Sequence, residues 1–141
     1  LDLPPGTGDI QLTLVQKLAL TGAIIVTTPQ NLALLDVKKG ADMFNKVNTP
    51  VLGIIENMTH FMCPHCNEMT KIFPGEGGTE ESNRLNVPLL GQIYLSPEIS
   101  ASTENGIPYV LNHENSPITS EFNNIASQIY SIPGVPILNK M

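Results

Sequence analysis

Runs of apolar residues alternate along the chain with segments in which apolar residues recur at a helical period. Two short runs are continuous and rich in β-branched residues, as expected of strands buried on both faces: residues 23–28 (AIIVTT) and 51–55 (VLGII). A third strand is predicted over residues 89–94. Strands that alternate with helices favour right-handed βαβ units, so the pattern predicts an α/β fold with a doubly wound parallel sheet.

Two helices are predicted in the first third of the chain, where apolar residues recur at steps of three and four. The first covers about residues 9–20, with an apolar face made by Ile10, Leu14 and Leu18. The second covers about residues 32–47, and Asn31 is its expected N-cap. Its apolar face is made by Leu34, Val37, Ala41 and Phe44.

Two further helices are predicted later in the chain. A short polar helix covers about residues 79–86. The last helix begins after Ser116, with Pro117 in the first turn, a position that proline favours. Its apolar stripe is made by Phe122, Ile125, Ala126, Ile129 and Tyr130. The tail over residues 132–141 carries prolines and a glycine and is predicted to be irregular, which leaves residues 1–131 as the expected domain.

The charge and the cysteine content exclude several classes of function. The 141 residues carry seven Lys plus Arg against 13 Asp plus Glu, a net charge of −6. A basic footprint for nucleic acid is therefore absent, and anionic membrane surfaces would repel such a chain. The sequence has no run of about 18 apolar residues, so it predicts no membrane span. Two cysteines are too few for a secreted disulfide framework, which favours a reducing intracellular compartment.

Both cysteines lie together in the motif Cys63-Pro64-His65-Cys66, within an expected projecting loop over residues 59–72. Two thiolates at this spacing can bind one metal centre from a single turn, but tetrahedral zinc and iron–sulfur clusters usually need four ligands. A second copy of the chain would complete four thiolates. His60 and His65 flank the cysteines and are interpreted as bystanders.

The cysteine pair has other readings. A redox dithiol of the thioredoxin kind belongs at a helix N-terminus directly after a strand, whereas this pair follows a predicted loop. A zinc ribbon within one chain needs a second CxxC motif, and the sequence has none. A plain structural pair of thiols is the remaining alternative.

Polar residues follow three predicted strands, at the strand ends where doubly wound folds place their ligands. They are Asp2 with its glycine-rich turn, residues 27–30, and Glu56 with Asn57. An acidic residue that closes a buried strand before such a turn is the arrangement that holds Mg²⁺ beside a nucleotide phosphate. Asp2 fits that role.

The neighbouring residues leave alternatives open. The amides of Gly6 and Gly8 could face a terminal phosphate, since glycine permits positive φ or close backbone approach; equally, the segment could be only a tight turn. Asn57 could hydrogen-bond a purine edge or satisfy the loop backbone. The glycines within residues 75–78 are interpreted as a turn and not as a P-loop, because no GKS or GKT follows them.

Four stretches together resemble the Mrp/ApbC-type P-loop ATPases, which carry or scaffold iron–sulfur clusters and are relatives of MinD and ParA. The resemblance runs from residue 1 to about residue 110, and its most specific part is the combination of VLGIIENM with CPHC. The matching stretches are DLPPGTGD (2–9), TTPQNLALLDVKKGADMF (27–44), VLGIIENM (51–58) with CPHC (63–66), and VPLLG (87–91).

The resemblance implies a P-loop NTPase fold and an ATP-dependent homodimer that carries a labile [4Fe–4S] cluster to apo-protein acceptors. Cys63 and Cys66 of both subunits would hold the cluster. Asp2 would be the catalytic residue that orders Mg²⁺, residues 4–8, with Gly6 and Gly8, would sense the γ-phosphate of ATP, and Asn57 would contact adenine. Relatives act in the bacterial cytoplasm or the mitochondrial matrix.

The sequence also departs from the family pattern. The family's Walker A loop with its two lysines is not in this chain, which opens on Leu1 without an initiator Met. We therefore expect a fold that is incomplete at the N-terminus, with an unfilled sheet edge, and a chain that by itself neither binds ATP well nor hydrolyses it. Tyr94 stands where the family usually has a proline near the base.

Two other functions remain open at this level. A MinD/ParA-like positioning ATPase, which binds membrane or DNA, would need a basic surface or a basic amphipathic C-terminal helix, and residues 131–141 provide neither. It also has no use for the CPHC motif. A zinc-stabilised dimer without cluster transfer would use the same four thiolates, because zinc and iron both accept four cysteines.

Overall fold

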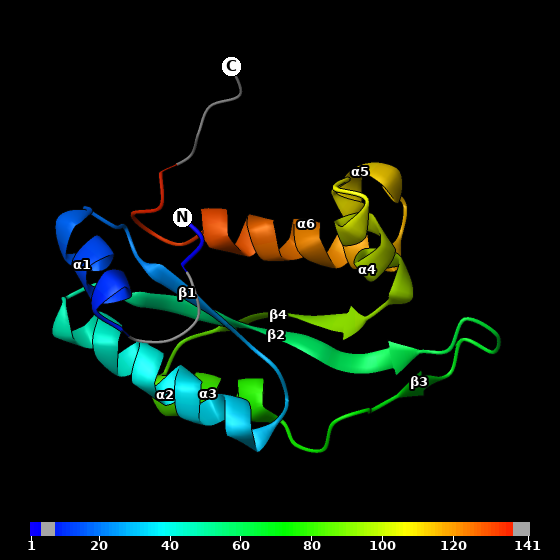
Figure 1. Cartoon of the computed structure of the whole chain (residues 1–141), viewed down its shortest axis with the longest axis horizontal. Helices are drawn as coiled ribbons and strands as arrows, with labels where there is room; N and C mark the ends of the chain where they lie inside the picture. Colours follow the sequence, from blue (N-terminus) through cyan, green and yellow to red (C-terminus); the bar gives the residue numbers. More distant parts are fainter. Residues whose placement is uncertain (4–7, 137–141) are drawn as a thin grey trace.

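The chain forms a largely parallel sheet with helices on both faces (Figure 1). The computed structural model describes residues 1–3 and 8–136. Three strands are parallel and lie in the order β1-β2-β4: β1 (Ala23–Thr27), β2 (Val51–Met62) and β4 (Leu89–Leu95). The short strand β3 (Met69–Thr70) pairs antiparallel with the end of β2. The predicted doubly wound α/β fold is confirmed.

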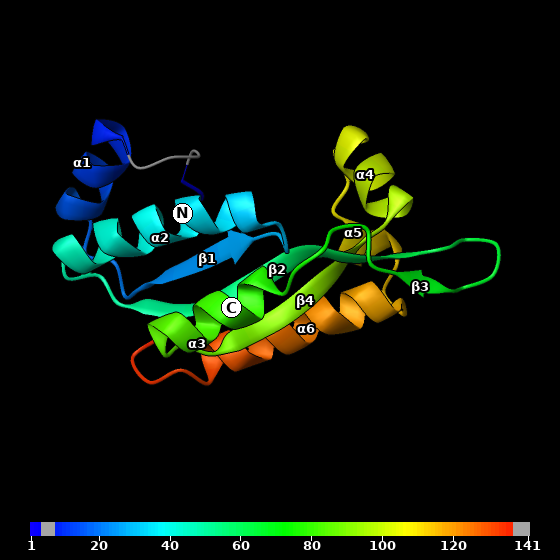
Figure 2. The ribbon, with the colours of Figure 1, turned by 90° about the horizontal axis from the view of Figure 1, so that it is seen from below.

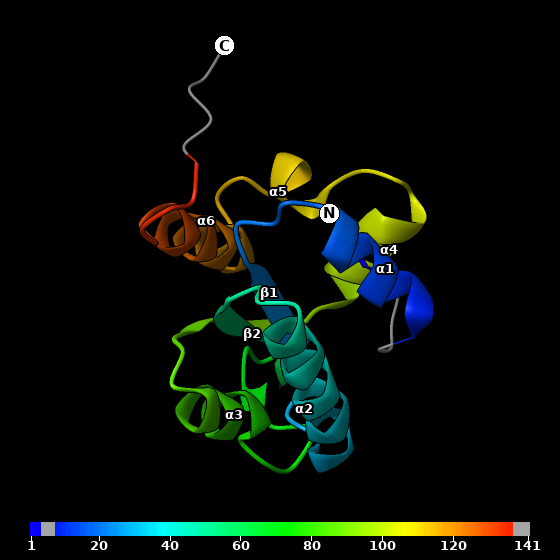
Figure 3. The same cartoon turned by 90° about the vertical axis from the view of Figure 1, so that its left-hand side faces the viewer.

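Six helices surround the sheet within the described residues: α1 (Asp9–Lys17), α2 (Asn31–Lys46), α3 (Gly77–Leu85), α4 (Pro97–Glu104), α5 (Tyr109–Asn112) and α6 (Pro117–Tyr130). Helices α2 and α3 cover one face of the sheet and α6 covers the other, as Figure 3 shows from the end of the molecule. Helices α4 and α5 lie at the end of the sheet from which β2 projects (Figure 2). In the part of the chain that the structure describes, no helix is long and apolar enough to cross a membrane.

The core follows from the alternation of side chains along the strands. Ile25 and Ile54 point to one face, where they pack against Val37 and Ala41 of α2. Their neighbours in sequence point to the opposite face and pack around Leu90, Ile93 and Ile125: Ile24 and Ile55. Both faces of β1 and β2 are therefore apolar, which is why these strands read as continuous hydrophobic runs.

The predicted start of the last helix is confirmed, whereas the predicted starts of two earlier helices were wrong. Ser116 is the N-cap of α6, and its hydroxyl oxygen accepts the Thr119 N–H at 3.0 Å, with Pro117 in the first turn. Asn31 is not the cap of α2; Gln30 holds that position and makes no side-chain cap hydrogen bond. The predicted helix over 79–86 begins two residues earlier, so only Gly75 of the three glycines stays in a turn.

Two predicted apolar faces were also wrong. The predicted face of the first helix, Ile10, Leu14 and Leu18, is 70%, 36% and 44% exposed, because α1 rests on α2 through Val15 instead. The helix also ends at Lys17, so Leu18 is its C-cap and not part of it. Of the predicted stripe on α6, only Ile125 is buried. The other buried residues of this helix, Ile118 and Thr119, lie outside the stripe. The other predicted members of the stripe are half-buried or exposed: Phe122, Ala126, Ile129 and Tyr130.

The two edges of the sheet differ. At the outer edge of β4, side chains of α6 satisfy the strand backbone: the Gln92 N–H donates to Glu121 Oε1 at 3.2 Å, and Gln128 Nε2 donates to the Leu90 carbonyl at 2.8 Å. Gly91 lies between them, where a methyl group would overlap Ile125 and Glu121. At the other edge, no strand of the described residues pairs with the free side of β1, in line with the expected unfilled edge.

Candidate functional site

Strand β2 carries the cysteines away from the sheet. It does not end at Ile55, as the sequence predicted, but continues to Met62. Its pairing with β4 shifts register once between Ile54 and Ile55, is regular from Ile55 to Asn57, opposite Ile93, and resumes at Phe61, opposite Leu95. The extra residues form a bulge, which bends the strand and increases its twist. Met58, inside it, has a φ of 58°, an uncommon conformation for a residue with a side chain.

Beyond the bulge the chain forms a projecting hairpin, which Figures 1 and 2 show extending past the sheet. We call residues 59–72 the cysteine hairpin. Its arms pair at Phe61 with Thr70 and at Met62 with Met69. At the tip, the Cys63 N–H donates to the Glu68 carbonyl at 3.0 Å, and the Asn67 N–H donates to the Cys63 carbonyl at 2.9 Å.

Both cysteines are free thiols at this tip, with Cys63 half-buried and Cys66 exposed. The backbone N–H groups of His65 and Cys66 hydrogen-bond to the Cys63 sulfur, as does the Cys66 thiol, and these bonds hold the pKa of Cys63 below its usual range. Because donors that face a sulfur favour the thiolate, the turn is suited to a metal ligand. The tip has no helix N-terminus of the thioredoxin kind.

The tip supplies only part of a metal site. Among the described residues, no three His, Cys, Asp or Glu side chains lie together in a way that could hold a metal ion. His65 is exposed, and His60 faces a small cavity at the base of the hairpin. The donor set therefore fits one half of a four-thiolate site, in which a second hairpin would supply the remaining sulfurs.

Glu56 lies at the base of the hairpin and is only 2% exposed. Sequence reasoning noted it at a strand end but gave it no role. Its Oε1 accepts the Gly78 N–H at 2.7 Å, and its Oε2 accepts a hydrogen bond from Gln92 Nε2 at 2.7 Å. A cavity of about 170 Å³ adjoins it, lined also by Thr59, His60 and the Lys71–Glu76 ion pair. A charged residue inside an apolar strand run was the signal available in the sequence.

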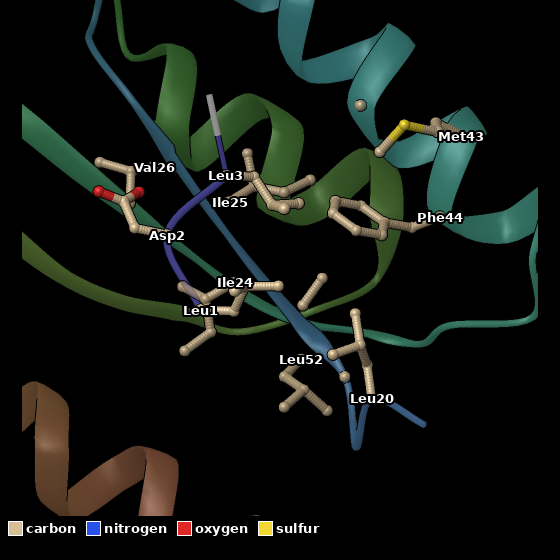
Figure 4. A pocket seen from close by; sticks show the side chains of 13 residues that line it. Leu1, Asp2, Leu3, Leu20, Ile24, Ile25, Val26, Met43, Phe44 and Leu52 are labelled. Atoms are coloured by element: carbon tan, nitrogen blue, oxygen red, sulfur yellow. The ribbon is translucent and has the colours of Figure 1, made fainter. Parts of the chain in front are cut away.

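Asp2 lies apart from the hairpin, in a different pocket. It is exposed and lines a cavity of about 480 Å³ along the free edge of β1. Figure 4 shows Leu1 and Leu3 beside Ile24 and Ile25 of β1, with Phe44 of α2 closing one side. This cavity is mainly apolar in its side chains, and Asp2 is the one acidic group among the described residues that line it.

Of the other predicted nucleotide residues, neither Gly8 nor Asn57 lines the cavity beside Asp2. Gly8 is the N-cap residue of α1, and its φ of −75° is open to any amino acid, so of the two uses considered for this glycine the structure does not show positive φ. Gly6 lies outside the described residues. The side-chain oxygen of Asn57 accepts the Met58 N–H at 2.9 Å and so satisfies the backbone at the bulge. Its contact with adenine stays a prediction, as do the roles of Asp2, Gly6 and Gly8.

Tyr94 lies on β4, two residues beyond Gln92. Burial raises the pKa of Tyr94 above its usual value, and the nearby Tyr109, Glu98 and Glu121 raise it further. Its phenol is therefore neutral near pH 7 and adds no charge beside the sheet.

Known proteins of related sequence include iron-sulfur cluster transfer proteins and iron-sulfur cluster carrier proteins. The chain is 44% identical over 128 residues to the iron-sulfur cluster transfer protein NUBPL of Dictyostelium discoideum, a match that covers 91% of the chain and 40% of that protein. It is 46% identical over 133 residues to the iron-sulfur cluster carrier protein of Aquifex aeolicus, which covers 94% of the chain and 36% of that protein. The chain thus spans well under half the length of these relatives.

Solved structures with the same fold are also known. The nucleotide-binding protein in complex with ADP from Archaeoglobus fulgidus is 36% identical, with a TM-score of 0.70 over 85% of this chain and 48% of that chain. The septum site-determining protein MinD complexed with Mg-ADP from Pyrococcus horikoshii is 27% identical, with a TM-score of 0.61 over 82% of this chain and 43% of that chain.

The chain also matches a model of a whole protein family. The family model described as ParA, NUBPL iron-transfer P-loop NTPase matches residues 1–130, which include β1, β2, the cysteine hairpin and α6. The chain therefore belongs to the NUBPL iron-transfer P-loop NTPases of the ParA type.

Proposed function

We propose that this chain is the cluster-bearing part of an iron–sulfur cluster carrier. Two copies would bring their cysteine hairpins together, and Cys63 and Cys66 of each would hold one [4Fe–4S] cluster as cargo for apo-protein acceptors. The observation that carries the proposal is the hairpin tip, where two free thiols lie together, Cys66 exposed and Cys63 half-buried, with backbone N–H groups that hydrogen-bond to the Cys63 sulfur. An exposed tip leaves the cargo accessible to an acceptor.

The relatives support the same cargo. Those named above are an iron-sulfur cluster transfer protein and an iron-sulfur cluster carrier protein, and a third relative, 41% identical, is the iron-sulfur protein required for NADH dehydrogenase, mitochondrial, of Arabidopsis thaliana. These names place the carriers in bacteria and in mitochondria, and we propose the bacterial cytoplasm or the mitochondrial matrix as the compartment of this chain.

ATP control of the carrier is a further part of the proposal. Two solved neighbours are described with ADP, one of them with Mg-ADP. In the whole protein, Asp2 would order Mg²⁺, Gly6 and Gly8 would lie near the terminal phosphate, and Asn57 would face adenine once its side chain left the Met58 amide. ATP hydrolysis would belong to that whole protein, because phosphoryl transfer needs a lysine-bearing phosphate loop.

Anaerobic reconstitution of the chain with ferrous iron and sulfide tests the cargo. We expect broad absorbance near ~400 nm, about two iron atoms per chain and a dimer in sedimentation, because one four-iron cluster is shared by two chains. The Cys63→Ala/Cys66→Ala variant should lose all three signals, whereas His65→Ala should keep them. A cluster that persists in the double variant would refute the proposal.

A zinc-stabilised dimer is the competing outcome, because the same tip suits any tetrahedral thiolate metal. Metal analysis of protein purified without oxygen separates the two. A colourless dimer with about one zinc per two chains, and no uptake of iron and sulfide, would favour the zinc site over the carrier.

A further inference from the structure

Both arms of the cysteine hairpin meet at one buried carboxylate. The outgoing arm is β2 itself, whose pairing with β4 is interrupted by the bulge at Met58, two residues after Glu56, and resumes only at Phe61. The returning arm runs from β3 through residues 71–76 into α3, where the Gly78 N–H donates to Glu56 Oε1 at 2.7 Å. The second oxygen of the same carboxylate accepts from Gln92 of β4 at 2.7 Å. One side chain thus bridges β2, α3 and β4 at the foot of the hairpin.

The surroundings explain why a charge is tolerated there. The donors to Glu56 are a backbone amide in the first turn of α3 and a neutral side-chain amide. A helix N-terminus stabilises a carboxylate, since its unpaired N–H groups carry partial positive charge. Within the described residues Glu56 makes no salt bridge. Its carboxylate is held by the hydrogen bonds that it accepts from Gly78 and Gln92, and such bonds fix the direction of both donors.

The returning arm packs closely around this bridge. A methyl group on Gly78 would come within 2.8 Å of the Glu56 Cβ, and one on Gly77 within 2.7 Å of a Leu34 methyl. Gly75 has a φ of 110°, and a methyl group there would lie 2.6 Å from the Pro29 carbonyl oxygen, in the loop between β1 and α2. The arm is therefore closely packed against both Glu56 and the strand ends where nucleotide residues are proposed.

We infer that Glu56 is the positioning residue of the cysteine hairpin. By holding Gly78 and Gln92 together, its carboxylate sets the angle at which the hairpin leaves the sheet, and the contacts of Gly75 and Gly78 tie that angle to the Pro29 loop. The inference deepens the proposed carrier function, because two tips can share a cluster only if each points at the other.

A lever estimate gives the size of the effect. Cys63 lies seven positions after Glu56, about 20 Å of strand at roughly 3.3 Å per residue once the bulge is allowed for. A tilt of about 15° at the base would therefore move the tip by about 5 Å. Such a displacement is large compared with the tolerance of roughly 0.5 Å within which a ligand set must be held.

Distance measurement between two spin labels tests the inference on the whole metal-free chain. One label is attached to Cys66 in a Cys63→Ser background, and the other to Asp36→Cys on the exposed side of α2. We expect a narrow distance distribution in this parent. Gln92→Glu places a second carboxylate against Glu56, so the distribution should widen and shift by about 5 Å.

The exchanged pair Glu56→Gln/Gln92→Glu restores one carboxylate and one amide at the same place, and the parent distribution should return. The matched control is Glu76→Gln, which removes a carboxylate from the same arm but only from an exposed ion pair. Any of three results would overturn the inference. The distance distribution could be unchanged by Gln92→Glu, it could stay wide in the folded exchanged pair, or it could shift equally in the Glu76→Gln control. Circular dichroism confirms folding of each variant.

A second pair of variants approaches the bridge from the helix side. Gly78→Ala should push α3 away from Glu56 and shift the distribution, whereas Gly40→Ala, a helical glycine with open space around it, should not. Since no readout needs a metal, a chain that keeps the distance behaviour but takes up no iron and sulfide would refute the carrier and leave the positioning role standing. If the chain loads a cluster but the Gln92→Glu and Gly78→Ala variants leave the distance distribution unchanged, the positioning role is refuted and the carrier function stands.

Discussion

The two long edges of this sheet are treated in opposite ways. At β4, Glu121 and Gln128 of α6 hydrogen-bond to the outward backbone groups of Gln92 and Leu90, so that edge is closed by side chains of the same chain. At β1, the free side borders a cavity of about 480 Å³ lined mostly by apolar residues. Proteins commonly block exposed edges because unpaired strands recruit other strands. Among the described residues, only the β4 edge is blocked in this way.

The composition of the two strands agrees with this difference. Strand β1 is β-branched throughout its middle, as a strand between two neighbours would be, yet Val26 is 62% exposed. Strand β4 contains Gln92 and Tyr94 and reads as a boundary strand. The contrast teaches that β1 has the side chains of a central strand in the position of an edge strand, and that its free side suits a further apolar strand.

The largest effect is expected at the closed edge. Gly91→Ala would place a methyl group against Ile125 and Glu121 and force α6 away from β4. We expect a loss of about 1–3 kcal/mol in the free energy of unfolding, as for other overpacked sites. Urea unfolding followed by circular dichroism measures it, and an unchanged midpoint would mean that α6 is not seated on β4 as described.

A smaller loss is expected when the cover is removed without overpacking. Gln128→Ala deletes the donor to the Leu90 carbonyl, and we expect a loss of about 1 kcal/mol in the same urea assay. Asn124→Ala, an exposed position on the same helix, is the control. Equal behaviour of the two variants would deny Gln128 its role at the edge.

At the open edge the same type of change should have the opposite sign. Gly40 lies in α2 and borders the β1 cavity, with nothing within 4 Å of an added methyl group. Gly40→Ala should therefore stabilise the fold by about 0.5–1 kcal/mol, because glycine is a poor helix former. A loss of stability in the urea assay would show that the space beside β1 is not open.

The smallest change in stability is expected at Val26. Val26→Lys places a charge on the exposed side of β1, and the free energy of unfolding should change by less than about 0.5 kcal/mol. The concentration at which the chain self-associates should nevertheless rise, since a lysine on an edge strand opposes strand addition. Sedimentation velocity over a range of concentrations measures this, with Val26→Thr as the uncharged control. Equal association of both variants would exclude this edge as the contact.

The sequence pattern predicted the elements whose signals are local. The β-branched runs located β1 and β2, and the pair Ser116-Pro117 located the start of α6. The same signal, Ser96-Pro97, starts α4, where the Ser96 hydroxyl oxygen accepts the Glu98 N–H at 3.1 Å. That helix was not predicted, although its capping residues could have revealed it.

What depended on distant partners could not be predicted. The apolar face of α1 was misassigned because periodicity defines a stripe without saying which neighbour covers it. Glu56 gained no role because its two donors lie 22 and 36 residues further along the chain. The cysteine pair, by contrast, was located on a projecting segment from the motif and its spacing alone.

The turn at the tip of the hairpin has a consequence for the order of folding. Its two backbone hydrogen bonds join Cys63 to Asn67 and to Glu68, so they close within six residues and need nothing from the sheet. Hairpins form in roughly 1–10 μs, well before contacts between distant strands. The two sulfurs would thus come together before the sheet is complete. A second tip can complete the site only once the folded sheet holds each hairpin at its angle, so metal would stabilise the native dimer over the unfolded chain and the melting temperature would rise with metal concentration.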